Sequence, residues 1–297
     1  MTTPSRFLDP SVVARLGTID IKARTIVEGF LSGLHRSPFR GYSVEFAEYR
    51  PYLPGDDLAT LDWKVFARTD RHVVRKFEHD TNLECHIVLD ISRSMSFASG
   101  TVSKLEYGSY VAATLAYLMH RQHDAVGLVT VDDRIRFRMP PGVRSGHLRA
   151  LLVALERVTP GEATRLATPF GDLVEAIDWR GLVVVISDLL DDSDAVIDGL
   201  SHFRHKGTDV VVFQVLDPYE REFPFERASR FRDMESGEEV ALVPGEMRER
   251  YVTRMREQIA HYRHALGQHG IDYCLLTTTD PLDTALLAYL QTRRKSR

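Results

Sequence analysis

The fold is decided by residues 84–96, which read ECHIVLDISRSMS. Residues 85–89 form a run of strand length that is apolar except for His86, and Asp90 follows it directly. Ser92 and Ser94 then place two hydroxyls at alternate positions of the next loop. A short apolar run bounded by polar residues is typical of a strand that is covered on both faces. The stretch therefore predicts a buried strand that ends in a carboxylate and two hydroxyls.

Further apolar strands and amphipathic helices continue this pattern to the end of the chain. Strands are predicted at 125–131, 134–139, 182–186, 209–216 and 271–276, and helices at 105–118, 148–158, 170–177, 195–205, 247–266 and 281–290. This alternation predicts an α/β fold, with a mostly parallel sheet and helices on both faces. We expect residues 83–297 to form one Rossmann-like domain with a hairpin insertion near 218–243.

The first 82 residues differ from this pattern. Apolar residues recur at helical spacing over 10–35, with Asp9 placed to cap a helix there. Residues 38–82 are rich in aromatic residues, Asp and Arg, and they read as a turn-rich segment with short strands. No Gly/Ser linker separates this part from residue 83, so we expect residues 1–82 to dock on the main domain rather than move freely.

Composition excludes several classes of protein. The chain has 297 residues, of which 43% are hydrophobic and 27% charged, and its net charge is −4. A slightly acidic chain is not drawn to nucleic acid by its overall field. We find no signal peptide and no stretch of roughly 18 apolar residues, so we expect no membrane insertion. Two cysteines are too few for a disulfide framework, which favours the cytoplasm.

A second strand end carries an acid as well. The predicted strand 182–186 is followed by Ser187 and Asp188. Because the carboxyl ends of parallel strands meet at one edge of the sheet, Asp188 is expected to lie near Asp90. Carboxylates and hydroxyls are hard oxygen ligands that suit Mg²⁺ or Mn²⁺. Two carboxylates with hydroxyls leave such an ion electrophilic and incompletely coordinated, so a carboxylate of another molecule is a natural last ligand.

This pattern resembles a known interaction site. Asp90-x-Ser92-x-Ser94 after a strand resembles the metal-ion-dependent adhesion site (MIDAS) of von Willebrand factor A domains. The resemblance implies a Thr from a second loop and an Asp from a third. Asp188 matches the third loop, and Thr164 matches the second, with Thr168 as its rival.

The resemblance extends upstream of the strand. The sequence EFAEYRPYLPGDD at 45–57, DWK at 62–64 and AR at 67–68 resemble a bacterial family called domain of unknown function fifty-eight. Its members carry a von Willebrand factor A-like domain, and the likeness covers roughly residues 38–216. Members often accompany MoxR-type AAA+ ATPases, which implies such an ATPase or its client as the partner. Many members carry membrane helices, and this chain resembles the short soluble form.

The role of the segment 45–68 stays open between two interpretations. Its acidic and basic residues alternate closely with turn residues, which is typical of a salt-bridged segment that fixes the N-terminal part to the sheet. A surface that binds a partner is the other interpretation.

Our leading hypothesis is a non-enzymatic adaptor. Asp90, Ser92, Ser94, Thr164 and Asp188 would hold Mg²⁺ (or Mn²⁺), and the ion would bind a partner's carboxylate. The chain has no Walker-A, Gly-x-Gly-x-x-Gly or Gly-x-Ser-x-Gly motif. One alternative is an Mg²⁺-dependent phosphohydrolase that uses Asp90 and Asp188, although the sequence indicates no nucleophile, no phosphate cradle and no lysine beside the acids. The other is a structural scaffold without metal.

Overall fold

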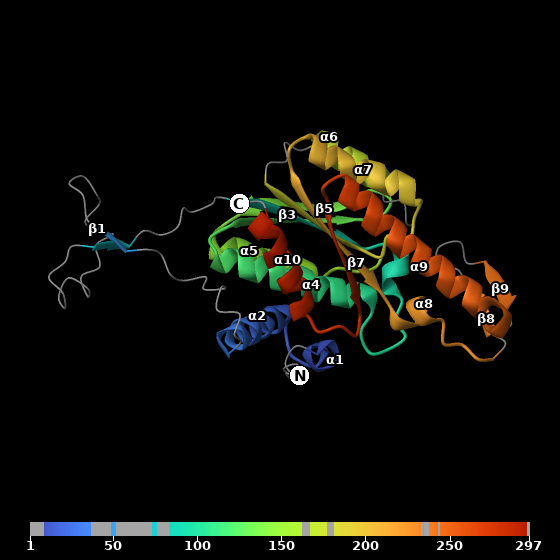
Figure 1. Ribbon diagram of the computed structural model, residues 1–297. Coiled ribbons are helices and arrows are strands. Elements are labelled where there is room, and N and C mark those ends of the chain that lie inside the picture. Colours follow the sequence, from blue (N-terminus) through green and yellow to red (C-terminus); the bar gives the residue numbers. More distant parts are fainter. Residues whose placement is uncertain are drawn as a thin grey trace.

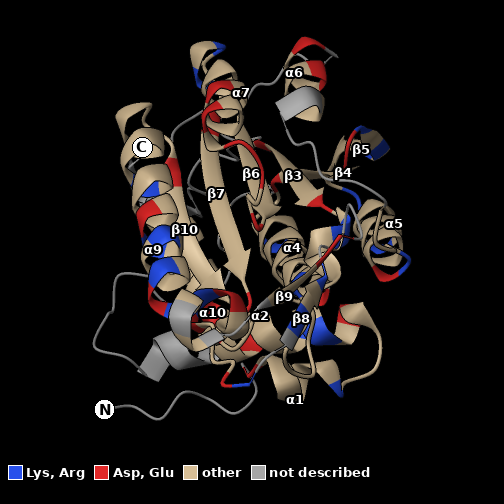
Figure 2. Ribbon diagram, turned by 90° about the vertical axis from the view of Figure 1, so that its right-hand side faces the viewer, with Lys and Arg blue, Asp and Glu red and all other residues tan. Residues whose placement is uncertain are grey.

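A six-stranded sheet forms the centre of the molecule (Figure 1 and Figure 2). The computed structural model describes residues 9–36, 49–51, 73–75, 83–161, 167–176, 181–227, 229–232, 234, 238–242 and 244–295. The strands are β3 (Glu84–Asp90), β4 (Ala125–Val131), β5 (Ile135–Gly142), β6 (Leu182–Ser187), β7 (Asp209–Leu216) and β10 (Asp272–Thr277). Their order is β10-β7-β6-β3-β4-β5, and every pair is parallel except β4 with the edge strand β5. The predicted mostly parallel sheet is therefore confirmed.

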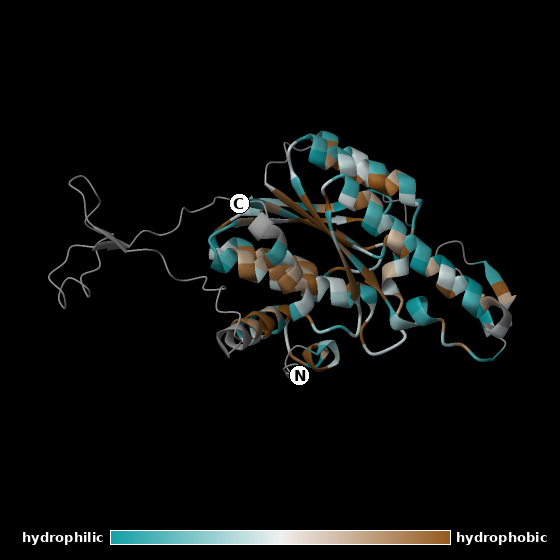
Figure 3. Cartoon of the chain, in the orientation of Figure 1, coloured by the Kyte–Doolittle hydropathy of each residue, from teal (hydrophilic) through white to brown (hydrophobic). Residues whose placement is uncertain are grey.

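Helices cover both faces of the sheet, as predicted (Figure 1). They are α4 (Lys104–Arg121), α5 (Ser145–Glu156), α6 (Ala167–Ala176), α7 (Ser193–His205), α9 (Pro244–Gln268) and α10 (Asp283–Lys295). Residues of α4, α5 and α10 share one core with Ile87 and Leu89 of β3, whereas residues of α6, α7 and α9 share the other with Val88. Successive side chains of a strand point to opposite faces, which explains why one apolar run supplies both cores. The strands accordingly appear as hydrophobic in Figure 3.

The N-terminal part packs on the first of these cores. The single helix predicted at 10–35 is wrong in one respect, because the structure divides it into α1 (Pro10–Ala14) and α2 (Ile19–Arg36). Gly17, a poor helix former, lies in the exposed break between them. Residues of α2, including Ile26 and Phe30, are buried in the core that contains α4.

An insertion follows β7. It contains the unpredicted helix α8 (Pro218–Glu222) and the strands β8 (Ser229–Arg232) and β9 (Glu239–Leu242), which pair antiparallel as a hairpin. Five aromatic rings with centroids 4.7–5.6 Å apart join α8, the hairpin and α9, and they belong to Tyr219, Phe223, Phe225, Phe231 and Tyr251. These rings give the insertion a small core of its own, beside the N-terminal end of α9 (Figure 1).

Only a part of the segment 38–82 is described. The strands β1 (Tyr49–Pro51) and β2 (Val73–Arg75) pair antiparallel. Most of the 45–68 signature, and with it the choice between its two proposed roles, lies outside the described residues. Among the helices in the described ranges, none combines the length and apolar character that a membrane crossing requires.

Candidate functional site

Asp90 and Asp188 lie at the same edge of the sheet. Asp90 is the last residue of β3, and Asp188 follows β6 directly. The two strands are parallel neighbours, so their following loops leave the sheet side by side. The hydroxyl of Ser187 donates a hydrogen bond to Oδ2 of Asp90 at 2.6 Å, which joins the two strand ends. Both Asp side chains are buried, so the structure brings together the two carboxylates that the sequence predicted.

The two predicted hydroxyls lie in the loop after β3. The backbone N–H of Ser92 donates to Oδ1 of Asp90 at 2.8 Å, which turns the chain back over the strand end. A single turn of 3₁₀ helix, η3 (Arg93–Ser96), follows, and Met95 anchors it in the core. The hydroxyls of Ser92 and Ser94 lie 3.0 Å apart and share a hydrogen bond. The first loop thus gathers a carboxylate and two hydroxyls, as predicted.

The loop after β6 is held from three sides. Leu189 adopts φ of 55°, a left-handed conformation that costs a non-glycine residue about 1–2 kcal/mol. Its N–H donates to the hydroxyl of Ser187 at 2.9 Å, and its carbonyl accepts from the Tyr262 hydroxyl at 3.0 Å. The side chain of Gln214 donates to the Asp188 carbonyl at 2.9 Å. These bonds from β7 and α9 hold Asp188 in place before any ligand binds.

The second loop is described only at its start. Thr164 lies outside the described residues, as does the side chain of Thr168, so the choice between them stays a prediction. Gly161 is described, and its N–H donates to the carbonyl of Ile91 in the first loop at 2.6 Å. A Cβ at Gly161 would lie 2.3 Å from Oδ2 of the buried Asp132. The chain is thus in contact with the first loop three residues before Thr164.

The structure also adds a cation that the sequence did not indicate. Lys104, the first residue of α4, is fully buried. Its Nζ lies 2.7 Å from Oδ2 of Asp188 and 2.5 Å from Oε1 of Glu220 on α8. The statement that no lysine lies beside the acids is therefore wrong. Lys104 is 84 residues from Asp188 and 116 from Glu220, and only the folded chain brings them together.

Burial controls the electrostatics of this site. Burial, with the nearby negative charge of Asp188 as the second cause, raises the pKa of Asp90 to about 7. Burial alone would lower the pKa of Lys104, but the charges of Asp188 and Glu220 outweigh it and raise that pKa. Burial also raises the pKa of Glu220, against the opposing effect of Lys104. Two carboxylates, Asp188 and Glu220, therefore share one ammonium group, and Asp90 lies close enough to Asp188 to feel its negative charge.

The donor atoms fit a hard divalent cation. Asp90, Ser92, Ser94 and Asp188 offer carboxylate and hydroxyl oxygens, the ligands that Mg²⁺ prefers. Figure 2 shows the acidic end of β3 at this edge of the sheet. In the described part of the chain, no group of three or more His, Cys, Asp or Glu side chains lies close enough together to hold a metal ion. The site proposed from the sequence has two carboxylates and two serine hydroxyls, so it is of a different type from such a group.

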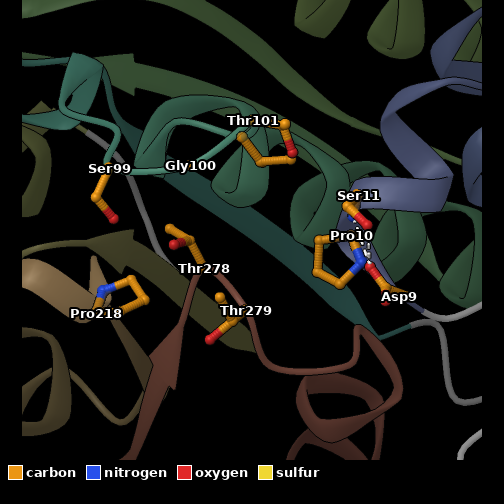
Figure 4. A pocket seen from close by; sticks show the side chains of 10 residues that line it. Asp9, Pro10, Ser11, Ser99, Gly100, Thr101, Pro218, Thr278 and Thr279 are labelled. Carbon is orange, nitrogen blue, oxygen red and sulfur yellow. Dashed lines mark hydrogen bonds between the residues drawn. The ribbon is translucent and has the colours of Figure 1, made fainter.

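A cavity of about 380 Å³ lies next to the first loop (Figure 4). Its walls come from the start of α1, the loop before α4, the start of α8 and the end of β10, and hydroxyls of Ser99, Thr101, Thr278 and Thr279 line it. The buried Asp217, which follows β7, accepts a hydrogen bond from the Ser99 N–H at 2.8 Å. This bond ties the loop after η3 to α8.

The sheet order, the helices on both faces, and the aspartate that ends β3 with the two serines of the following loop together define a Rossmann-like domain of the von Willebrand factor A type. The chain belongs to the family described as "Protein of unknown function DUF58", which matches residues 48–261. Uncharacterized proteins of Mycobacterium tuberculosis and Mycobacterium bovis are 29% identical to it over 238 residues, which is 77% of this chain and 73% of each relative.

Similar solved structures include an aerotolerance-related membrane protein of Bacteroides fragilis. It has 20% identity and a TM-score of 0.49, and the match covers 72% of this chain and 99% of that one. The protein BatB of Bacteroides thetaiotaomicron has 16% identity and the same TM-score, covering 72% and 100%. The SpRpn10 VWA domain has 11% identity and a TM-score of 0.39, covering 69% and 93%.

Proposed function

We propose that this protein is a non-enzymatic interaction module that binds a partner's carboxylate through Mg²⁺ (or Mn²⁺). The ion would be held by Asp90, Ser92, Ser94 and Asp188, with Thr164 from the second loop. The observation that carries this proposal is the convergence of two buried carboxylates and two hydroxyls at one edge of the sheet, with the Ser187 bond at 2.6 Å between the strand ends. When bound, the ion supplies an open coordination position for an oxygen ligand.

The residues of the chain have distinct tasks in this mechanism. Asp90 and Asp188 supply the negative charge that attracts the cation. Ser92 and Ser94 supply neutral oxygens, so the charge of the ion is not over-compensated and a further carboxylate can bind. Leu189 and Tyr262 hold the third loop in place, which lowers the entropy cost of ordering it on binding.

The proposed partner is a MoxR-type AAA+ ATPase or a client of such an ATPase. Membership of the family supports this partner, because the resemblance of the sequence to that family implies that members often accompany those ATPases. We place the protein in the cytoplasm, where the thiols of Cys85 and Cys274, which form no disulfide, would stay reduced. The net charge of −4 supports a protein partner over nucleic acid.

A binding assay with the purified ATPase tests the proposal. We expect the wild-type protein to capture the partner in Mg²⁺ and to lose it in a chelator. Asp90→Ala should abolish capture in both buffers, whereas Asp198→Ala, an exposed site on α7, should leave it unchanged. Capture that is indifferent to the chelator and to Asp90→Ala would contradict the metal-bridged mechanism.

A phosphohydrolase that uses Asp90 and Asp188 is the second candidate, and the position of Lys104 beside Asp188 is the observation in its favour. Against it, the ammonium group of Lys104 is fully buried and paired with both Asp188 and Glu220, so it does not face a substrate. Turnover of phosphoesters in Mg²⁺ that is lost in Asp188→Ala would favour the enzyme. A scaffold without metal would show no heat of Mg²⁺ binding in calorimetry.

A further inference from the structure

A fully buried lysine is shared between two carboxylates of different loops. The ammonium group of Lys104 lies 2.7 Å from Oδ2 of Asp188 and 2.5 Å from Oε1 of Glu220. The other oxygen of Asp188, Oδ1, accepts from the N–H of Leu190 at 3.2 Å. Asp188 is therefore already paired with the ammonium group of Lys104 through Oδ2, which makes the shorter of the two contacts. Any metal ion that binds Asp188 must compete with Lys104.

Glu220 is positioned to weaken that competition. It lies on α8, and its second oxygen, Oε2, accepts the N–H of Asp217 at 2.9 Å in a capping box. Asp217 in turn accepts from Ser99 of the loop before α4. Glu220 is thus held by Asp217, which is itself bonded to the loop before α4, and its other oxygen, Oε1, attracts the ammonium group of Lys104.

We propose that Glu220 is a positioning residue of the metal site, which holds Lys104 and so leaves Asp188 available to the ion. This inference rests on the proposed function, because it concerns the same site. With the charge of Glu220 removed, Asp188 is the one carboxylate among the described residues that still pairs with Lys104, and the pair tightens. With Lys104 removed, Asp188 loses its cation partner among the described residues, and the ion no longer meets the repulsion of that ammonium group.

The inference makes the insertion a part of the site. Glu220 follows Tyr219 on α8, and the rings that join α8 to the hairpin and α9 include Tyr219, Phe223 and Phe225. A shift of α8 would therefore move the carboxylate that holds Lys104. No contact between the hairpin and the metal ligands is needed for this effect.

Calorimetric titration with MgCl₂ tests the inference. A unit charge at ion-pair distance in a partly buried site changes binding on the order of tenfold, so we expect Glu220→Gln to bind Mg²⁺ about tenfold more weakly. Glu222→Gln is the matched control, because it removes the same charge from the exposed face of the same helix. It should bind like the wild type. The unfolding midpoint of each variant without Mg²⁺ shows that it is folded.

A double variant separates a role through Lys104 from a direct effect of charge. We expect Lys104→Met to bind Mg²⁺ more tightly than the wild type, and Glu220→Gln to have a smaller effect in that background. Equal binding by the wild type and folded Glu220→Gln overturns the inference and leaves the proposed function intact. An undiminished effect of Glu220→Gln in the Lys104→Met background also overturns it. Failure of the wild type to bind Mg²⁺ at millimolar concentration overturns both.

Discussion

Replacing Gly161 by alanine should destabilise the protein, because the space for a side chain is already filled. The new Cβ would lie 2.3 Å from Oδ2 and 3.0 Å from Cβ of Asp132. Asp132 cannot withdraw, because its side chain is fully buried and the Nε of Arg136 donates to both of its oxygens, at 2.7 and 2.6 Å. Gly161 must move instead.

The movement has a calculable cost. Shifting Gly161 weakens its 2.6 Å hydrogen bond to the carbonyl of Ile91, a loss of about 1 kcal/mol. Forcing an extra methyl group into packed surroundings adds about 1–3 kcal/mol. We expect Gly161→Ala to lower the free energy of unfolding by about 2–4 kcal/mol in total. It should also weaken Mg²⁺ binding, because the second loop leaves its contact with the first.

Urea denaturation measures this change, and the chain offers a matched control. Gly171 lies within α6, and a Cβ there would meet nothing within 4 Å. Gly171→Ala should therefore stabilise the protein by about 0.5–1 kcal/mol, the usual gain of alanine over glycine in a helix. If Gly161→Ala is as stable as the wild type, or gains stability as Gly171→Ala does, our account of the contact with Asp132 is wrong.

Three further predictions concern buried polar groups. Burial, helped by Arg138, lowers the pKa of His86 to about 4. The unfolded chain then binds a proton that the folded protein excludes, so the free energy of unfolding should fall by at most about 3 kcal/mol between pH 6.5 and pH 4. His86→Asn should remove this part of the pH dependence, and parallel stability profiles of the wild type and the variant would contradict it. Ser187→Ala should cost about 1–3 kcal/mol in thermal unfolding, because Asp90 and the Leu189 N–H lose their partner; an unchanged midpoint would refute this. Tyr262→Phe should cost about 1 kcal/mol and weaken Mg²⁺ binding through the third loop, and a variant that loses stability but binds Mg²⁺ normally would argue against that loop's role.

Most of the sheet could be predicted from the sequence, because each strand is a separate apolar run. The limits of β4 and β7 agree with the prediction at both ends. The break between α1 and α2 was not predicted, because apolar spacing continues across Gly17 and conceals it. The helix α8 was missed because its five residues are too few to show a helical period.

The site was predictable as far as it depends on strand ends. Asp90 and Asp188 each follow an apolar run, and topology alone brings such positions together. Lys104 and Glu220 have no such signal, since their contacts depend on how α4 and α8 meet the sheet. The capping box at Ser103 does place Lys104 at the start of a helix, which was the available indication that its side chain lies near this edge.

The central claim is a metal ion at the carboxyl edge of the sheet, and a crystal grown or soaked in Mn²⁺ tests it most directly. We predict an anomalous difference peak at coordination distance from oxygens of Asp90, Ser92 and Ser94, and in contact with Asp188 directly or through water. The same map would decide between Thr164 and Thr168. A crystal soaked to saturation in Mn²⁺ that shows no peak at these residues, or a peak only elsewhere on the protein, would contradict the account.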